Sequence, residues 1–301
     1  MQEFVSGVVR LPIVFVNAYF VDVEDGWVLI DSGLPGFAGK IKAAAQERYG
    51  DTPPRAIVLT HGHFDHASNA RVLAEAWDAP IYAHRLEIPY LSGQSDYPPH
   101  DPTVGGAIAF LSRAMPDKSL NLGSQLRALP DGDAGNFAGE IPELPGWKIL
   151  FTPGHSPGHV SLYHAAKGVL LAGDALATAN LDSWLGLISQ KPELARAGTP
   201  YNCDWKATRS SIEKLAALEV QAIGAGHGNP LMHENLTKDL REFAGSFLPP
   251  KHGRYVHEAA QVDENGVVSV PSPAPDSFPK IAVGIGATAL LFSLWKRKKT
   301  R

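Results

Sequence analysis

The chain has 301 residues, an ordinary apolar content of 44% and a formal net charge of −4 at pH 7. This length predicts one large domain or two small ones with a substantial core. No stripe of basic residues occurs before the extreme C-terminus, which argues against nucleic acid as the main partner. The single cysteine, Cys203, cannot form an internal disulfide and is expected to be a structural thiol. The N-terminus has no basic segment followed by an apolar one, so we expect no secretory signal and a cytoplasmic location.

The first third of the chain alternates patterns typical of strands and helices. β-branched and aromatic residues predict strands at 13–23 and 27–30, with a turn at 24–26. Helical spacing covers residues 37–49 and stops at Gly50. The elements that follow are a strand at 56–59, a helical pattern over 67–77 and a strand at 81–83. The alternation indicates helices packed against a sheet.

The predicted strand at 56–59 runs directly into Thr-His-Gly-His-Phe-Asp-His at residues 60–66. In an extended segment His61 and His63 point the same way, because side chains alternate with a period of two. Asp65 and His66 follow the bend and can face a second metal ion. Imidazole and carboxylate together suit zinc, iron or manganese. A polar loop of hydrogen-bonded histidines is the alternative, but three histidines and an aspartate in one short loop favour a metal site.

Three later loops repeat this arrangement of a strand followed by a metal-type side chain. The predicted strands before these loops cover residues 147–151, a hairpin of 160–164 with 169–172, and 221–224. The loops contain His155, Asp174 and His227. Because strand ends can converge at one edge of a sheet, we expect these residues to form one site with His61 and His63.

Other polar residues receive supporting or peripheral roles. Asp31 ends a predicted strand and is either a carboxylate that orients a ligand histidine or a turn residue. His159 is expected to support the loop around His155 rather than to bind metal. The histidines without ligand-like spacing are expected at the surface or packed: His84, His100, His164, His233, His252 and His257.

Residues 92–145 are rich in Pro, Gly and Asp and show one helical patch at about 104–114. Such a long irregular segment either shapes a substrate pocket or is a plain surface insertion. Tyr201, Trp184 and Leu185 follow the Asp174 loop, where residues of a pocket wall are expected. Apolar walls would favour an acyl chain or an aromatic substrate, and packing in the core is the equal alternative.

Over residues 13–248, these motifs resemble the metallo-β-lactamase-fold hydrolase superfamily. The resemblance implies an α/β fold, an αββα sandwich with a dinuclear metal site along one edge. It implies two divalent metal ions with a hydroxide between them, with zinc expected and iron or manganese as alternatives. The implied ligands are His61, His63 and His155 for one ion, Asp65, His66 and His227 for the other, and Asp174 as the bridge.

By this resemblance, the bridging hydroxide attacks a carbonyl ester, and Asp65 and Asp174 are the catalytic ligands. An aspartate at 174 makes the chain similar to lactonases, glyoxalase II enzymes and related esterases rather than to true β-lactamases of this fold. A lactone, or another carboxylic ester or thioester, is therefore the expected small-molecule substrate. Acyl-homoserine lactonases often carry a tyrosine three residues after that aspartate, where this chain has Ala177, and Tyr201 is the candidate replacement.

Four other functions remain open at this point. They are a β-lactamase activity, a phosphodiesterase or nuclease, an enzyme similar to the persulfide dioxygenases with one iron ion, and a metal-loaded binding or sensor module. The lack of a basic face argues against the phosphodiesterase, and no basic glutathione-binding C-terminal region matches glyoxalase II. The oligomeric state does not follow from the sequence.

Three parts are expected along the chain: a hydrolase domain at 1–250, a Pro-rich linker at 251–279 and a tail at 280–301. Residues 281–295 are uncharged and mostly apolar, and a basic cluster follows at 296–299, as in a membrane anchor. As a helix this run reaches only about 22 Å, against roughly 30 Å of hydrocarbon core. A terminal helix packed on the domain is the alternative. The basic end would place the enzyme outside the cytoplasm, which conflicts with the absence of a recognised signal.

Overall fold

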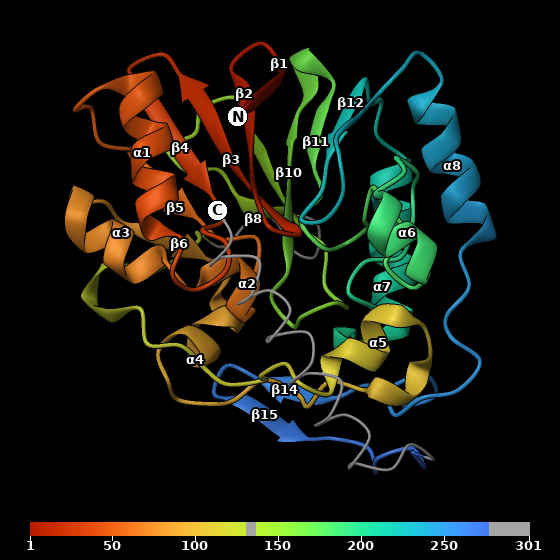
Figure 1. Ribbon diagram of the computed structural model, residues 1–301. Helices are drawn as coiled ribbons and strands as arrows, with labels where there is room; N and C mark the ends of the chain where they lie inside the picture. Colours follow the sequence, from red (N-terminus) through yellow and green to blue (C-terminus); the bar gives the residue numbers. More distant parts are fainter. Residues whose placement is uncertain (131–136, 277–301) are drawn as a thin grey trace, which may run out of the picture.

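The structure is a computed structural model, and it describes residues 1–130 and 137–276. Two β-sheets lie face to face (Figure 1). The first sheet runs through β1 (Gln2–Val5), β2 (Val8–Ile13), β3 (Val16–Val23), β4 (Gly26–Ile30), β5 (Ala56–Val58), β6 (Ile81–Ala83) and β7 (Leu126–Ala128). The second sheet runs through β13 (Leu231–Met232), β12 (Ala222–Gly224), β11 (Val169–Leu171), β10 (Val160–His164), β9 (Lys148–Phe151) and β8 (Phe137–Gly139).

Helices cover the outer face of each sheet, which confirms the expected αββα sandwich (Figure 1). Helices α1 (Ala38–Tyr49) and α3 (Ala70–Trp77) share a core with the first sheet. Helices α7 (Trp205–Ala216) and α8 (Leu236–Ser246) share a core with the second. The short helices are α2 (Phe64–Ala67), α4 (Ile88–Leu91), α5 (Ala107–Ser112) and α6 (Trp184–Ser189). The 3-10 turns are η1 (Arg85–Glu87), η2 (Pro102–Val104), η3 (Gly123–Gln125), η4 (Ala165–Lys167) and η5 (Thr199–Tyr201).

The period of two along each strand explains why the inner strands β4 and β5 of the first sheet consist of apolar residues and glycine. On β3, Tyr19 and Val21 belong to the core between the two sheets, while Phe20 belongs to the core under α1 and α3. A strand buried on both faces has no position for a solvated side chain. The first polar ligand-type residues therefore appear only where such a strand ends.

The strand predicted over residues 13–23 is confirmed over 16–23, but it begins three residues later than expected. β2 ends at Ile13, β3 begins at Val16, and the two strands pair antiparallel across a tight turn. Val14 takes a left-handed conformation in this turn, with a φ of 62°. A β-branched residue seldom adopts that conformation. The turn was not predicted because it contains no glycine or asparagine, the residue types that usually mark such a turn in a sequence. The predicted hairpin after residue 160 is confirmed by the antiparallel pairing of β10 with β11.

Residues 92–145, expected to be largely irregular, also contain a helix and strands of both sheets. They contain α5, within the predicted helical patch, and also β7 and β8 at the edges of the two sheets. The expected linker likewise contains a hairpin of β14 (Gln261–Asp263) and β15 (Gly266–Ser269). Val267 N donates to Ser95 Oγ at 3.2 Å, and Tyr255 OH donates to the carbonyl oxygen of Pro99 at 2.7 Å. Residues 253–269 therefore pack against the body of the protein.

The division of the chain at residues 250 and 279 stays a prediction. The apolar segment 281–295, expected to contact a membrane, lies outside the described residues. Within residues 1–130 and 137–276, no helix combines the length and the apolar character needed to cross a bilayer.

Cys203 lies beneath the C-terminal segment, and its carbonyl oxygen accepts a hydrogen bond from Ala260 N at 3.0 Å. Burial raises the pKa of the Cys203 thiol, so little thiolate is present near neutral pH. We expect a thiol reagent at pH 8 to react at least about 100-fold more slowly with the native full-length chain than with the denatured chain. Equal rates, measured by absorbance of the released chromophore, would contradict the role of Cys203 as a structural thiol.

Candidate metal centre

All seven residues that the resemblance implies as ligands come together at one edge of the two sheets. They extend from α2 and from the loops after β5, β9, β11 and β12. Three groups form in which one nitrogen or oxygen per residue lies within 4.8 Å of the others: His61, His63 and His155; His61, His66 and Asp174; and Asp65, His66 and His227. Segments from both sheets therefore contribute to a single cluster.

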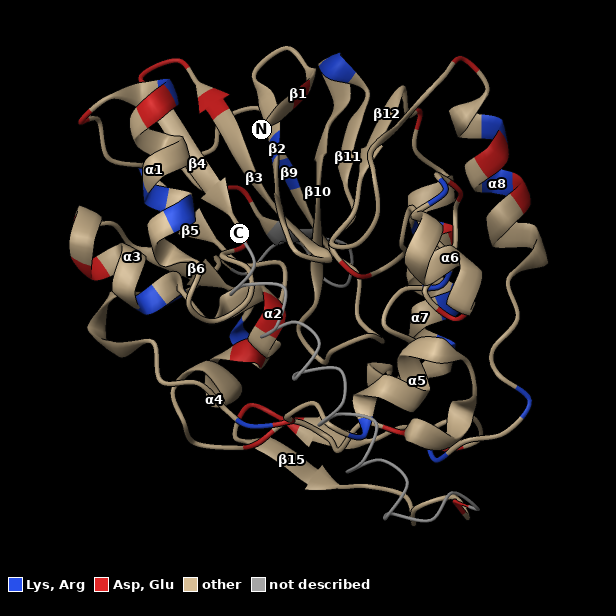
Figure 2. Cartoon of the chain, in the orientation of Figure 1, with Lys and Arg blue, Asp and Glu red and all other residues tan. Residues whose placement is uncertain are grey.

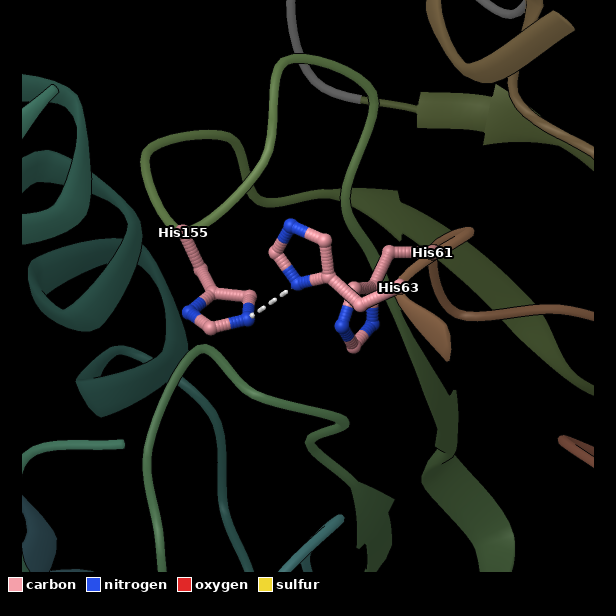
Figure 3. Close-up of side chains that lie close together, drawn as sticks. All are labelled: His61, His63 and His155. Atoms are coloured by element: carbon pink, nitrogen blue, oxygen red, sulfur yellow. Dashed lines mark hydrogen bonds between the residues drawn. The ribbon is translucent and has the colours of Figure 1, made fainter. Parts of the chain in front are cut away.

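The first group consists of three buried imidazole rings from two loops (Figure 3). His63 Nδ1 lies 3.0 Å from His155 Nε2. The ring of His61 is nearly perpendicular to those of His63 and His155, at interplanar angles of 90° and 89°. Three rings that converge with different orientations can direct one nitrogen each at a common point, as a tetrahedral metal site requires.

We call His61, His63 and His155 the first group, and Asp65, His66 and His227 the second group; Asp174 lies between them. Its Oδ1 is 3.6 Å from His66 Nε2, and its Oδ2 is 3.5 Å from His155 Nε2 and 3.2 Å from His227 Nε2. Asp65 Oδ2 lies 3.6 Å from His227 Nε2 on the other side of the second group. The carboxylate of Asp174 therefore faces histidines of both groups, as a bridging ligand would.

The chemistry of these side chains fits metal ions. His61 Nε2, His66 Nε2 and Asp174 Oδ1 are buried and hydrogen-bond to no group among the described residues. A buried polar atom without a partner is costly, and each such atom in a native protein calls for an explanation. Divalent cations at the two groups would satisfy all three atoms at once.

Electrostatics divides the cluster into a half of neutral histidines and a half in which histidines lie beside ionised carboxylates. Burial lowers the pKa of His61 and His63, and that of His155 to about 4, so these rings are held neutral, the form that binds metal. Burial acts in the opposite sense on Asp174, but His227 and His66 hold the pKa of that carboxyl well below its usual range. Burial lowers the pKa of His66, but the carboxylates of Asp174, Asp65 and Asp31 outweigh burial and raise it to about 10, and the pKa of His227 is raised as well. A divalent cation that binds beside these carboxylates would take the place of the protons on the two rings.

Hydrogen bonds outside the cluster orient its rings. Asp31 Oδ2 lies 2.8 Å from His66 Nδ1, and Thr60 donates to the same carboxylate from its backbone nitrogen and its hydroxyl, both at 2.8 Å. These contacts favour the orienting role for Asp31, although its φ of 57° makes it a turn residue as well. His227 Nδ1 donates to the carbonyl oxygen of Phe15 at 2.9 Å, which leaves Nε2 free to face a metal ion.

His159 supports the site, as expected, and does so through the loop of Asp174 as well as its own. Asp174 N donates to His159 Nε2 at 2.8 Å, while His159 Nδ1 lies 3.1 Å from the carbonyl oxygen of Thr152. Both ring nitrogens are therefore engaged with protein groups. Burial lowers the pKa of His159 to about 3, in agreement with a neutral ring.

The three residues expected in a pocket wall occupy different places. The ring of Tyr201 lies 5.0 Å from that of His63, and its hydroxyl is buried without a hydrogen-bond partner among the described residues. Trp184 and Leu185 lie on α6 with 53% and 76% of their surface exposed, so they do not serve core packing. His100, expected at the surface or packed, has its ring 5.5 Å from that of Tyr201.

Sequence reasoning missed Glu87 and Tyr97, which lie directly behind the first group. The ring of Tyr97 is 4.6 Å from that of His63, and its hydroxyl hydrogen-bonds to the carboxylate of Glu87. Glu87 is fully buried. The sequence does contain one sign of a buried Glu87, since this single acidic residue directly precedes the apolar run Ile88–Leu91. A buried carboxylate requires hydrogen-bond donors around it.

The comparisons with known proteins agree with this geometry. A family model described as the metallo-beta-lactamase superfamily matches residues 11–227. "Probable metallo-hydrolase YflN" of Bacillus subtilis (strain 168) is 39% identical over 247 residues, which are 80% of this chain and 91% of that protein. "Hydroxyacylglutathione hydrolase GloC" of Haemophilus influenzae is 29% identical over 163 residues, 52% of this chain and 63% of that protein. The solved structure of "TTHA1623 in a di-iron-bound form" is 30% identical with a TM-score of 0.50, and the match covers 75% of this chain and 93% of that one.

Proposed function

The chain belongs to the metallo-β-lactamase superfamily and is a metallo-hydrolase, and from this premise we propose that it hydrolyses a small carboxylic ester, with lactones and thioesters as the substrate class. The observation that carries the proposal is the position of Asp174 between two groups of imidazole rings. We further propose that the seven clustered residues are the ligands of two divalent ions. Zinc is the expected metal, and iron is the alternative that the di-iron form of the similar structure supports.

When bound, two divalent ions supply a water molecule of lowered pKa and a Lewis acid for the carbonyl oxygen. The side chains of this site would transfer the proton and bind the substrate. Asp65 has 14% of its side chain exposed, against 2% for Asp174, so Asp65 is the more accessible carboxylate to carry a proton toward the leaving group. The hydroxyl of Tyr201, which has no hydrogen-bond partner in residues 1–130 and 137–276, can donate a hydrogen bond to an ester oxygen.

Surface charge supports a small neutral substrate rather than a polyanion. Lysines and arginines alternate with aspartates and glutamates along α8, and α1 also carries both signs (Figure 2). Strong binding of a phosphodiester backbone requires a surface of one sign. A thioester stays in the substrate class because GloC is named a hydroxyacylglutathione hydrolase.

The test is a measurement of metal content and turnover on one sample purified without added metal. We expect about two metal ions per chain, and hydrolysis of a lactone or a thioester in preference to nitrocefin and bis-p-nitrophenyl phosphate. A chelator-treated portion should lose turnover and regain it with added metal. One iron ion per chain without hydrolysis would favour the dioxygenase-like alternative. Preferred turnover of the β-lactam or the phosphodiester would overturn the substrate class.

A further inference from the structure

The carboxylate of Glu87 connects the two loops that carry the first group of histidines. Its Oε2 accepts hydrogen bonds from Gly62 N at 2.9 Å and from the hydroxyl of Tyr97. Its Oε1 accepts hydrogen bonds from Ser156 Oγ and from Gly158 N, both at 2.7 Å. Four donors therefore surround a side chain with no exposed surface. Such a site specifies an acceptor with two equivalent oxygens.

The donors on the two ligand loops lie outside the strands, so hydrogen bonds within the sheets do not fix their positions relative to each other. Gly62 follows β5 of the first sheet, and Ser156 follows β9 of the second. Hydrogen bonds within a sheet cannot set the distance between two loops that leave different sheets. One backbone bond, from Val160 N to the carbonyl oxygen of Thr60 at 2.9 Å, also joins these segments. Glu87 adds one hydrogen bond to the loop of His61 and His63 and two to the loop of His155.

The packing around Glu87 leaves no room for side chains on the two glycines. A Cβ at Gly62 would lie 2.4 Å from the hydroxyl oxygen of Tyr97 and 2.5 Å from Leu91 Cδ2. A Cβ at Gly158 would lie 2.7 Å from Glu87 Cγ and 2.8 Å from its backbone nitrogen. Glycine at positions 62 and 158 therefore allows both loops to approach Glu87 closely.

The second group receives its support from other residues. Asp31 bonds to His66, and the carbonyl oxygen of Phe15 bonds to His227. Among the described residues, Glu87 accepts hydrogen bonds from Tyr97 and from the two loops of the first group. Asp31 contacts His66 of the second group directly, and it reaches His61 of the first group only through Thr60. Direct contact with Glu87 is therefore a feature of the loops of the first group.

We propose that Glu87 is a positioning residue that sets the separation of the two loops and thereby controls metal binding by His61, His63 and His155, but not by Asp65, His66 and His227. The inference rests on the metal site of the proposed function. Glutamine at this position keeps the size of the side chain but offers one acceptor oxygen. Its amide nitrogen would point donor hydrogens at two existing donors, either on the Gly62 side or on the Ser156 side.

The experiment measures cobalt binding to full-length, metal-free protein by absorbance, with chelator competition for the dissociation constants. Glu87→Gln is introduced into two backgrounds, each of which retains one group. His227→Ala disrupts the second group, and His63→Ala disrupts the first. We expect Glu87→Gln to raise the dissociation constant about 10- to 100-fold in the His227→Ala background, and by less than about 2-fold in the His63→Ala background.

Glu213→Gln is the matched control, because Glu213 has 54% of its side chain exposed on α7 and should change neither constant. Ser156→Ala removes one donor and serves if Glu87→Gln does not fold; it should shift the same constant about 3-fold. Equal weakening in both backgrounds, or unchanged binding in a folded variant, would overturn the role of Glu87. Wild-type protein that binds no cobalt would overturn the proposed metal site, and the role of Glu87 with it.

Discussion

The variant Asp174→Asn is expected to lower kcat/KM for the preferred ester by about 1,000-fold or more, equivalent to roughly 4 kcal/mol of transition-state stabilisation. The native carboxylate presents Oδ1 to His66 at 3.6 Å and Oδ2 to His155 and His227 at 3.5 and 3.2 Å. Asparagine keeps the shape but replaces one oxygen by an amide nitrogen that cannot ligate a cation. We also expect fewer metal ions per chain, measured on the same preparation as the kinetics.

Asp25→Asn is the control for loss of one negative charge, because the side chain of Asp25 is 85% exposed. This variant should retain wild-type kinetics and metal content. His61→Ala should resemble Asp174→Asn, since His61 belongs to two of the three groups. Full activity and unchanged metal content in Asp174→Asn would show that the site is placed wrongly.

The variant Gly226→Ala is expected to lose at least about 100-fold in hydrolysis, together with bound metal. A Cβ at Gly226 would lie 2.0 Å from Asp174 Oδ1 and 2.6 Å from His66 Cε1. The methyl group of alanine would therefore displace the side chains of Asp174 and His66. Gly226 is not among the glycines with positive φ, so backbone strain does not add to the effect. Metal analysis and steady-state kinetics test this expectation.

Gly245→Ala provides the matched control for the added methyl group. Gly245 lies in α8, where a Cβ would meet no atom within 4 Å. Alanine has the higher helix propensity, so this variant should keep full activity and gain about 0.5–1 kcal/mol in free energy of unfolding. Wild-type metal content in Gly226→Ala would contradict the close packing of Gly226 against the cluster.

The chemistry of the site was predictable because its signals are local. Each segment that carries candidate ligands follows a short strand, as the segment of His61 follows β5 and that of His227 follows β12. A strand buried on both faces can release polar residues only at its end. The motif at residues 60–66 contains four of these side chains within seven residues. The resemblance to a known family supplied the αββα arrangement, which the two face-to-face sheets confirm.

The groups that hold the ligands in place were decided by the tertiary structure. Glu87 lies 25 residues from Gly62 and 69 from Ser156 in the chain, and nothing in its local pattern indicates which donors it meets. His227 is oriented by the backbone carbonyl of Phe15, a group that every residue carries and that no sequence pattern marks. That carbonyl lies in the turn after β2, where Val14 takes its left-handed conformation. The sequence by itself thus determined which side chains can bind metal, because that depends on residue type and strand ends. Only the packing of the two sheets decided how far apart they stand and what orients them, because those contacts join residues distant in the chain.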